Sequence, residues 1–302
     1  MIDTRVTVGS LEFRSPIMTA SGTAGYGAEF EPYLDLSALG AVVTKSLAPY
    51  AWPGNPAPRV HPTAQGMMNA VGLQGPGIEH WLAHVLPDLV DTGATVVASI
   101  WGRSVDDYRA AAELLAGAPE QVVAVEVNLS CPNLEGRGSI FAHDPDLSAD
   151  VVRATAACGR PRWAKLSANT DRIVDVATAV ADAGADAVTC INTLLGLAYD
   201  EATLRPVLGA GGGGLSGRAI HPVAVRAVHD VHEALHDLPI IGVGGVASGW
   251  DAVEFLLAGA SAVQVGTASF AEPAACERIH DELRAWIQAR GMRAVSDLTA
   301  LA

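Results

Sequence analysis

Eight short apolar runs recur along the chain, separated by longer amphipathic stretches. The runs are almost continuously apolar, which is typical of parallel strands covered on both faces rather than of half-exposed strands. We predict strands at 16–21, 40–46, 95–101, 122–130, 162–167, 186–193, 239–245 and 261–267.

The stretches between the runs carry apolar residues at the helical period, and several end in Gly, the favoured residue just past a helix end. Eight strand–helix units in about 250 residues favour a (β/α)8 TIM barrel. An open doubly wound sheet is the alternative. We expect residues 1–302 to form a single domain. Helices are predicted at 80–93, kinked at Pro87, and at 106–117, 148–159, 172–184, 221–235, 249–259 and 275–291.

A small N-terminal β-hairpin with a Gly-Ser turn is predicted over 5–13, where it would close the bottom of the barrel. Three connections, 47–80, 131–146 and 194–220, are longer than a barrel needs, and each follows a strand. They should therefore lie at the C-terminal face, where barrel active sites form. Long loops can be plain surface, but three on one face, each rich in Asn, Gly and Pro, indicate function.

Two lysines end apolar strands, Lys45 in VVTKS and Lys165 in RWAKLS. Burying an ammonium group without a partner is costly. One such lysine could pair with a carboxylate inside the barrel, and Glu126, one layer deeper than Asn128 on the same side of its strand, is the available acidic residue. Two lysines at C-terminal strand ends favour an anionic ligand.

Glycines follow the last two strands, in the pairs Gly244-Gly245 and Gly266-Thr267. Barrels often bind a phosphate at this place through backbone N–H groups, and Gly lets the backbone approach closely. The pair Ser216-Gly217 could join the same pocket. With several Asn side chains at the strand ends, which suit an amide-like ring, these residues predict a barrel that holds a phosphate-bearing cofactor.

Cys131 comes three residues after Asn128 and just before a proline. It is either a reactive thiol at a strand end or a buried thiol before a turn. The other cysteines, Cys158, Cys190 and Cys276, are interpreted as buried small hydrophobic residues. No CxxC pair occurs in the sequence, which disfavours a thiolate-held zinc or iron–sulfur cluster in this chain.

The net charge of −14 argues against nucleic acid or an anionic membrane as the main partner. No apolar run reaches the roughly 18 residues of a membrane span. The first residues also lack the pattern of a secretory signal. A cytoplasmic location is expected.

Motifs spread in order from residue 15 to 273 resemble those of the dihydroorotate dehydrogenases. The motif VNLSCPN is similar to that of class 1 of the family, because class 1 enzymes have Cys rather than Ser at the catalytic position. INTLLG and GGLSG are most similar to the class 1B catalytic subunit. The motifs are ASGTAGYG (20–27), TKSL (44–47), GNPAPR (54–59), GMMNAVGLQGPG (66–77), VNLSCPN (127–133), AKLSANTD (164–171), CINTLLG (190–196), GGLSGRAIHP (213–222), IIGVGG (240–245) and VQVGTASF (263–270).

The resemblance implies an FMN-binding barrel that oxidises dihydroorotate to orotate in pyrimidine biosynthesis. Cys131 would act as general base for the C5 proton, and flavin N5 would accept the hydride from C6. Substrate contacts are implied for Lys45, Asn69, Gly72, Leu73, Asn128, Asn192 and Thr193. FMN contacts are implied for Ser21, Lys45, Ser46, Ser99, Asn128, Lys165, Ile191, Gly217, Gly244, Gly245, Gly266 and Thr267.

The resemblance also assigns catalytic roles to the two lysines. Lys165 is expected beside the flavin pyrimidine ring, where it would stabilise negative charge on the reduced cofactor. Lys45 is expected to pair with the orotate carboxylate. Both cations would favour the thiolate of Cys131.

Some residues depart from the family pattern. Ser99 stands where the family usually has Asn, Arg218 where Pro is common, and Glu135 and Arg137 in a loop that is plainer in 1B relatives. Class 1B enzymes pair with a subunit that carries FAD and an iron–sulfur cluster and pass electrons to NAD, whereas class 1A enzymes are homodimers that use fumarate. A homodimer or a heterotetramer is expected. The motifs favour 1B, so any FAD and iron–sulfur cluster should sit on a partner subunit.

Two alternatives stay open. A dihydropyrimidine dehydrogenase-like flavin barrel would act on uracil or thymine, which lack the carboxylate that Lys45 and the NAVGL loop favour. A barrel that binds flavin or a phosphoribosyl ligand without turnover would serve as a subunit or regulator. Ser99 is the one hint of such a role, and an intact Cys131 together with both lysines, Lys45 and Lys165, argues against it.

Overall fold

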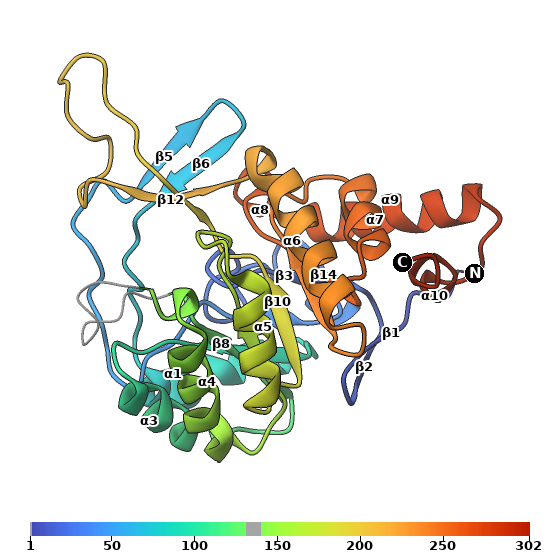
Figure 1. The fold of residues 1–302 in the computed structure, drawn as a ribbon, viewed down its shortest axis with the longest axis horizontal. Helices are drawn as coiled ribbons and strands as arrows, with labels where there is room; N and C mark the ends of the chain where they lie inside the picture. Colours follow the sequence, from blue (N-terminus) through green and yellow to red (C-terminus); the bar gives the residue numbers. More distant parts are fainter. Residues whose placement is uncertain (1, 131–139) are drawn as a thin grey trace.

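Eight parallel strands form the centre of the molecule in the computed structural model, which describes residues 2–130 and 140–302 (Figure 1). Their order around the sheet is β3-β14-β13-β10-β9-β8-β7-β4. Each lies within a predicted range, so all eight predicted strands are confirmed. The bounds are β3 Ile17–Thr19, β4 Val42–Val43, β7 Val96–Ile100, β8 Val122–Asn128, β9 Arg162–Lys165, β10 Ala187–Cys190, β13 Ile240–Val243 and β14 Ala262–Val265.

The first and last strands of this order, β3 and β4, meet and close the barrel. The backbone N–H of Thr19 donates to Ala41 O at 3.2 Å. The Thr19 hydroxyl accepts from the backbone N–H of Val43 at 2.8 Å. A side chain thus completes the pairing where the strands are short, and the closure excludes the open doubly wound sheet.

Helices surround the barrel, and all seven predicted helical segments are helical in the structure. The segment predicted as one kinked helix is two helices, because Val85 leaves helical geometry and Pro87 cannot donate a backbone hydrogen bond. No described helix combines the length and apolar character that crossing a bilayer requires. The helices are α1 Ile78–His84, α2 Leu86–Asp91, α3 Val105–Leu115, α4 Pro145–Ala154, α5 Ile173–Asp182, α6 His221–Ala234, α7 Gly249–Leu257 and α9 Ala275–Ala289, with the shorter, unpredicted α8 Ala268–Ala271 and α10 Val295–Thr299.

The predicted hairpin is present as β1 (Val6–Val8) and β2 (Leu11–Phe13). Val8 and Phe13 are buried against side chains that point into the barrel from its strands. The Phe13 ring meets Trp163 edge to face, with centroids 5.8 Å apart, a favourable aromatic geometry. The hairpin therefore closes the N-terminal end of the barrel, and ligands can reach the interior from the other end.

The long connections build a second, antiparallel sheet that the sequence analysis did not predict. It consists of β5 (Val60–Thr63), β6 (Gly66–Asn69), β11 (Leu194–Gly196) and β12 (Gly213–Ser216), in the order β11-β12-β6-β5. These strands are short and mostly half-exposed, and three of them contain glycine, so they form no long apolar run. The sheet joins two of the three long connections on one side of the barrel, as Figure 1 shows for β5, β6 and β12.

Candidate active site

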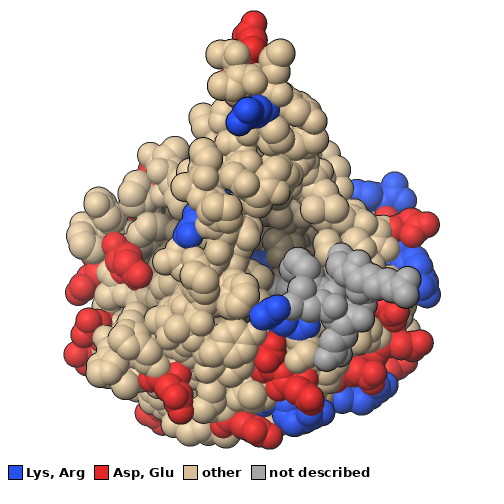
Figure 2. All heavy atoms as spheres, turned by 90° about the vertical axis from the view of Figure 1, so that its left-hand side faces the viewer, with Lys and Arg blue, Asp and Glu red and all other residues tan. Residues whose placement is uncertain are grey.

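The carboxyl ends of the barrel strands lie toward the antiparallel sheet. Figure 2 shows this side of the molecule as a surface that is hollowed near its centre. Lys and Arg side chains border the hollow, while acidic side chains gather farther out (Figure 2). The register of β8 and β9 places Asn128 opposite Lys165 at the ends of these two strands, and these residues are part of the candidate site.

Lys165 directs its ammonium group into the barrel and is 3% exposed. Its Nζ donates to the Ser21 hydroxyl at 3.1 Å and to Gln264 Oε1 at 3.3 Å. It also lies 3.4 Å from Oε1 of Glu126, a fully buried residue. The second carboxylate oxygen of Glu126 accepts from Thr189 and Gln264. The ion pair with Glu126 therefore accounts for the burial of Lys165. The expectation that an anionic ligand explains both lysines does not hold for Lys165 and now applies to Lys45 only.

Lys45 has a different environment. Its Nζ lies 5.9 Å from the centroid of the Tyr26 ring, and it forms no ion pair with a carboxylate of the described residues. Burial, aided by the positive charge of Arg59, lowers its pKa from 10.5 to about 8. An anionic ligand would relieve this cost, so Lys45 suits a carboxylate-bearing molecule.

Two asparagines, Asn128 and Asn192, contact each other at the carboxyl ends of the barrel strands. Asn192 Nδ2 donates to Asn128 Oδ1 at 3.2 Å, and Asn128 Nδ2 donates to the Ser46 hydroxyl at 3.2 Å. The Ser46 hydroxyl lies 2.9 Å from that of Ser99, so the serine at the family's usual Asn position joins this network. The Tyr108 hydroxyl, which sequence reasoning missed, donates to Asn128 O at 2.6 Å. These bonds hold in place the amide groups of Asn128, which ends β8, and of Asn192, two residues after β10.

The remaining predicted substrate residues line the antiparallel sheet and its approach. Asn69 Nδ2 reaches Gly214 O at 3.5 Å across β6 and β12. Gly72 and Leu73 have positive φ values of 73° and 61°, and a left-handed leucine is uncommon and is held only by its surroundings. Thr193 follows β10 and its carbonyl accepts from Asn169, while Ile191 is buried.

The predicted phosphate residues come together at the ends of β12, β13 and β14. The Thr267 hydroxyl donates to the Ser216 hydroxyl at 2.8 Å. The backbone N–H groups of Gly245, Gly266 and Thr267 have no acceptor among the described residues. Free N–H donors at this end of a barrel fit a phosphate group. Positive φ values require glycine at Gly217, Gly244 and Gly245.

The described residues do not include Cys131, Glu135 or Arg137, so the expectations for these three lie outside them. The other cysteines are buried, as predicted. Burial raises the pKa of the Cys190 and Cys276 thiols to about 12. Neither is suited to act as a thiolate base.

Sequence reasoning missed two polar residues of the Lys165–Glu126 network on other strands: Thr189, which donates to Glu126, and Gln264, which bonds both Lys165 and Glu126. Both are polar residues inside apolar strands and fully buried. That interruption was the available signal, because a buried polar side chain needs a partner. It does not reveal which partner, since that depends on how the strands are arranged.

Known proteins resemble this chain along almost its whole length. The family model described as "Dihydroorotate dehydrogenase" matches residues 3–287. The chain is 47% identical over 297 residues to the dihydroorotate dehydrogenase B (NAD(+)) catalytic subunit of Pelobacter propionicus, covering 98% of this chain and 97% of that protein. It is similar to the subunit of the same name from Trichlorobacter lovleyi (48% over 294 residues, 97% of this chain and 96% of that protein) and from Listeria monocytogenes (44% over 294 residues, the same shares).

Proposed function

This chain belongs to the dihydroorotate dehydrogenase family, and we propose that it is an FMN-dependent catalytic subunit that oxidises dihydroorotate to orotate in pyrimidine biosynthesis. The observation that carries the proposal is the side-chain set at the strand ends. The Asn128–Asn192 amide pair is hydrogen-bonded to Ser46, the residue next to Lys45, whose ammonium group lacks a carboxylate partner among the described residues. Amides suit the ring's N–H and C=O groups, and a cation suits its carboxylate.

The residues present also fit FMN. The free N–H groups of Gly245, Gly266 and Thr267 would hold the phosphate. Lys165 and Ser21, hydrogen-bonded to each other, would lie at the isoalloxazine ring. When bound, FMN supplies the hydride acceptor for the reaction. The positive charge of Lys165 would stabilise negative charge that develops on the ring, and Glu126 holds that ammonium group in place.

Cys131 is proposed as the base that removes the C5 proton. It stands three residues after Asn128 in the sequence, and Asn128 ends strand β8. A thiol can serve as a base near neutral pH when nearby cations favour its thiolate. Lys45, which follows β4, two places from β8 in the order of the strands, is a candidate for that cation.

We also propose that residues 1–302 act as one barrel domain and deliver electrons to NAD through a partner subunit that carries FAD and an iron–sulfur cluster. The relatives' names, which state NAD(+) and a catalytic subunit, support this. A projecting segment next to the site supplies surface for a partner, because Leu195, Leu197, Tyr199 and Leu204 are all more than half exposed.

One experiment tests the core proposal. The chain is purified alone, its visible spectrum is recorded, and dihydroorotate is added without oxygen. We expect a flavin band that bleaches. A missing band, or one that persists, would sink the proposal. Dihydrouracil in place of dihydroorotate tests the pyrimidine alternative, and bleaching by dihydrouracil alone would favour it. NAD, fumarate and quinone added to the bleached protein then identify the acceptor.

A further inference from the structure

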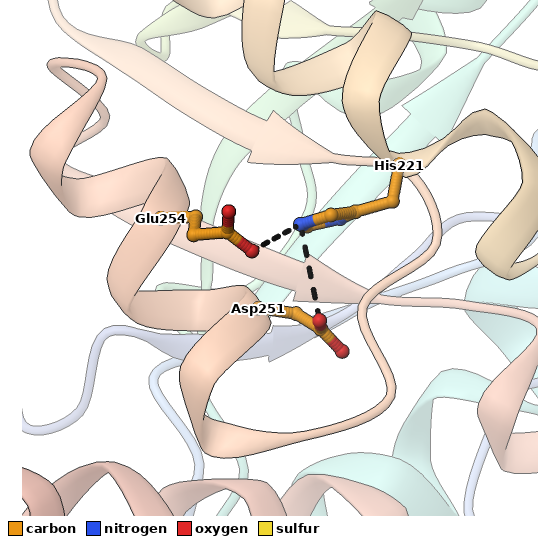
Figure 3. Close-up of side chains that lie close together, drawn as sticks. All are labelled: His221, Asp251 and Glu254. Carbon is orange, nitrogen blue, oxygen red and sulfur yellow. Dashed lines mark hydrogen bonds and ion pairs between the residues drawn. The ribbon is translucent and has the colours of Figure 1, made fainter.

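Three side chains of types that can ligate a metal meet outside the site described above, between helices α6 and α7 (Figure 3). His221 is the first residue of α6, and Asp251 and Glu254 lie three residues apart on α7, so both carboxylates share one face of that helix. Figure 3 shows both carboxylates pointing at the imidazole ring. His221 Nε2 lies 3.2 Å from Glu254 Oε2 and 3.9 Å from Asp251 Oδ1.

The outer hydrogen bonds prepare these atoms as ligands. His221 Nδ1 lies 2.9 Å from the carbonyl oxygen of Gly244. A carbonyl only accepts, so Nδ1 donates to it, and Nε2, which faces the carboxylate of Glu254 at 3.2 Å, is the nitrogen that a cation bound between them would take. Asp251 Oδ2 accepts from the backbone N–H of Ala247 at 2.8 Å, which leaves Oδ1 facing the histidine. In metal sites, hydrogen bonds of this kind orient the side chains that contact the metal.

We propose that His221, Asp251 and Glu254 bind a divalent transition-metal cation of the Zn²⁺ type. The three ligand atoms all lie within 4.8 Å of one another, and tetrahedral ligands about 2 Å from Zn²⁺ lie about 3.3 Å apart. Nitrogen and carboxylate oxygen are ligands that such cations accept. The side chains of His221 and Asp251 are 11% exposed and that of Glu254 is 36% exposed, so the site is sheltered and has an entry path.

A cation here would tie together three segments: the start of α6, helix α7 and the glycine turn after β13. The turn is held through the His221–Gly244 hydrogen bond. A Cβ added at Gly245 would lie 2.7 Å from His221 Cβ, so the histidine also packs against the turn. The cation would brace the turn that the proposed function assigns to the FMN phosphate, and this last step rests on that function.

The test is a Zn²⁺ titration of the chelator-treated, tag-free chain in competition with a chromophoric chelator. One tight equivalent per chain is expected, with Mg²⁺ unable to compete because it prefers six oxygen ligands. His221→Ala and Glu254→Gln should each weaken binding at least about tenfold. His229→Ala, at an exposed histidine of the same helix, should bind as the wild type does. Co²⁺ should give visible bands that both ligand variants lose.

Failure of the wild type to bind Zn²⁺ would overturn the site, and would mean that His221 is only hydrogen-bonded to Glu254. Binding that both ligand variants retain would also overturn it. Because Glu254 is partly exposed, its variant remains informative if His221→Ala does not fold. Zn²⁺ binding is read without flavin, so a failed metal site is distinguished from a failed proposed function. FMN retention with and without Zn²⁺ then tests the brace, and equal retention would refute it.

Discussion

Replacing Glu126 by Gln removes one negative charge from the barrel interior and keeps the side chain's shape. Glu126 is fully buried, 3.4 Å from the ammonium group of Lys165, which is itself 3% exposed. The variant would leave Lys165 with two neutral acceptors, the Ser21 hydroxyl and Gln264 Oε1. A buried cation would then lack its carboxylate.

The magnitude follows from this geometry. At 3.4 Å and an effective dielectric constant of about 20, the attraction between the two charges is about 5 kcal/mol. Breaking a buried pair by removing one partner costs about 3–5 kcal/mol. Because two acceptors remain, we expect the lower end, a loss of about 3 kcal/mol in the free energy of unfolding. This loss is a large share of the free energy of unfolding of a typical domain, roughly 5–15 kcal/mol.

Urea unfolding followed by tryptophan fluorescence measures the loss, since Trp163 is buried beneath this pair. Adding Lys165→Met should recover part of the stability, because the double variant buries no charge at all. Asp150→Asn is the matched control: Asp150 pairs with Arg153 at 2.8 Å, but both side chains are 59% exposed. Its effect should stay within about 0.5 kcal/mol. A Glu126→Gln effect as small as the control's, or a double variant whose losses simply add, would show that the Glu126–Lys165 pair does not stabilise the fold.

Three further expectations concern the strand ends. Burial lowers the pKa of Lys45 from 10.5 to about 8, so the charged lysine disfavours the folded state, and in urea unfolding the wild type should gain stability relative to Lys45→Met as the pH rises from about 8 to 10.5. Over the same pH range orotate should bind more weakly, because the ammonium group loses its proton, and pH-independent stability and binding would contradict both expectations. Cys131→Ala should keep FMN and orotate but reduce the flavin orders of magnitude more slowly in anaerobic stopped flow, whereas a near-normal rate would assign the proton to another base. Gly245→Ala should lower the melting temperature and FMN retention more than Gly159→Ala, because its new Cβ would lie 2.7 Å from His221 Cβ, whereas a Cβ at Gly159 would meet nothing within 4 Å. The two glycines have similar φ values, 71° and 64°, so equal effects would show that backbone strain alone matters.

The barrel itself could be predicted from the sequence because its signal is local. Strands buried on both faces must be apolar along their whole length, and helices outside them must be amphipathic. Even the hairpin under the barrel followed from its turn residues. The antiparallel sheet escaped prediction because β12 consists of Gly213, Gly214, Leu215 and Ser216, a composition typical of a loop. Its pairing with β6 exists only because the closed barrel brings the two connections together.

Which polar side chains end the strands can be read from the amino-acid sequence, since each strand's carboxyl end is visible in its own pattern. The partners of these side chains depend on the folded arrangement of the strands and helices. Lys165 pairs with Glu126, while Gln264, 138 residues away from Glu126 in the chain, completes the network. His221 meets Asp251 and Glu254 only because α6 packs beside α7. Such pairings depend on strand order, register and helix packing, which arise when the whole chain closes on itself and which no local pattern records.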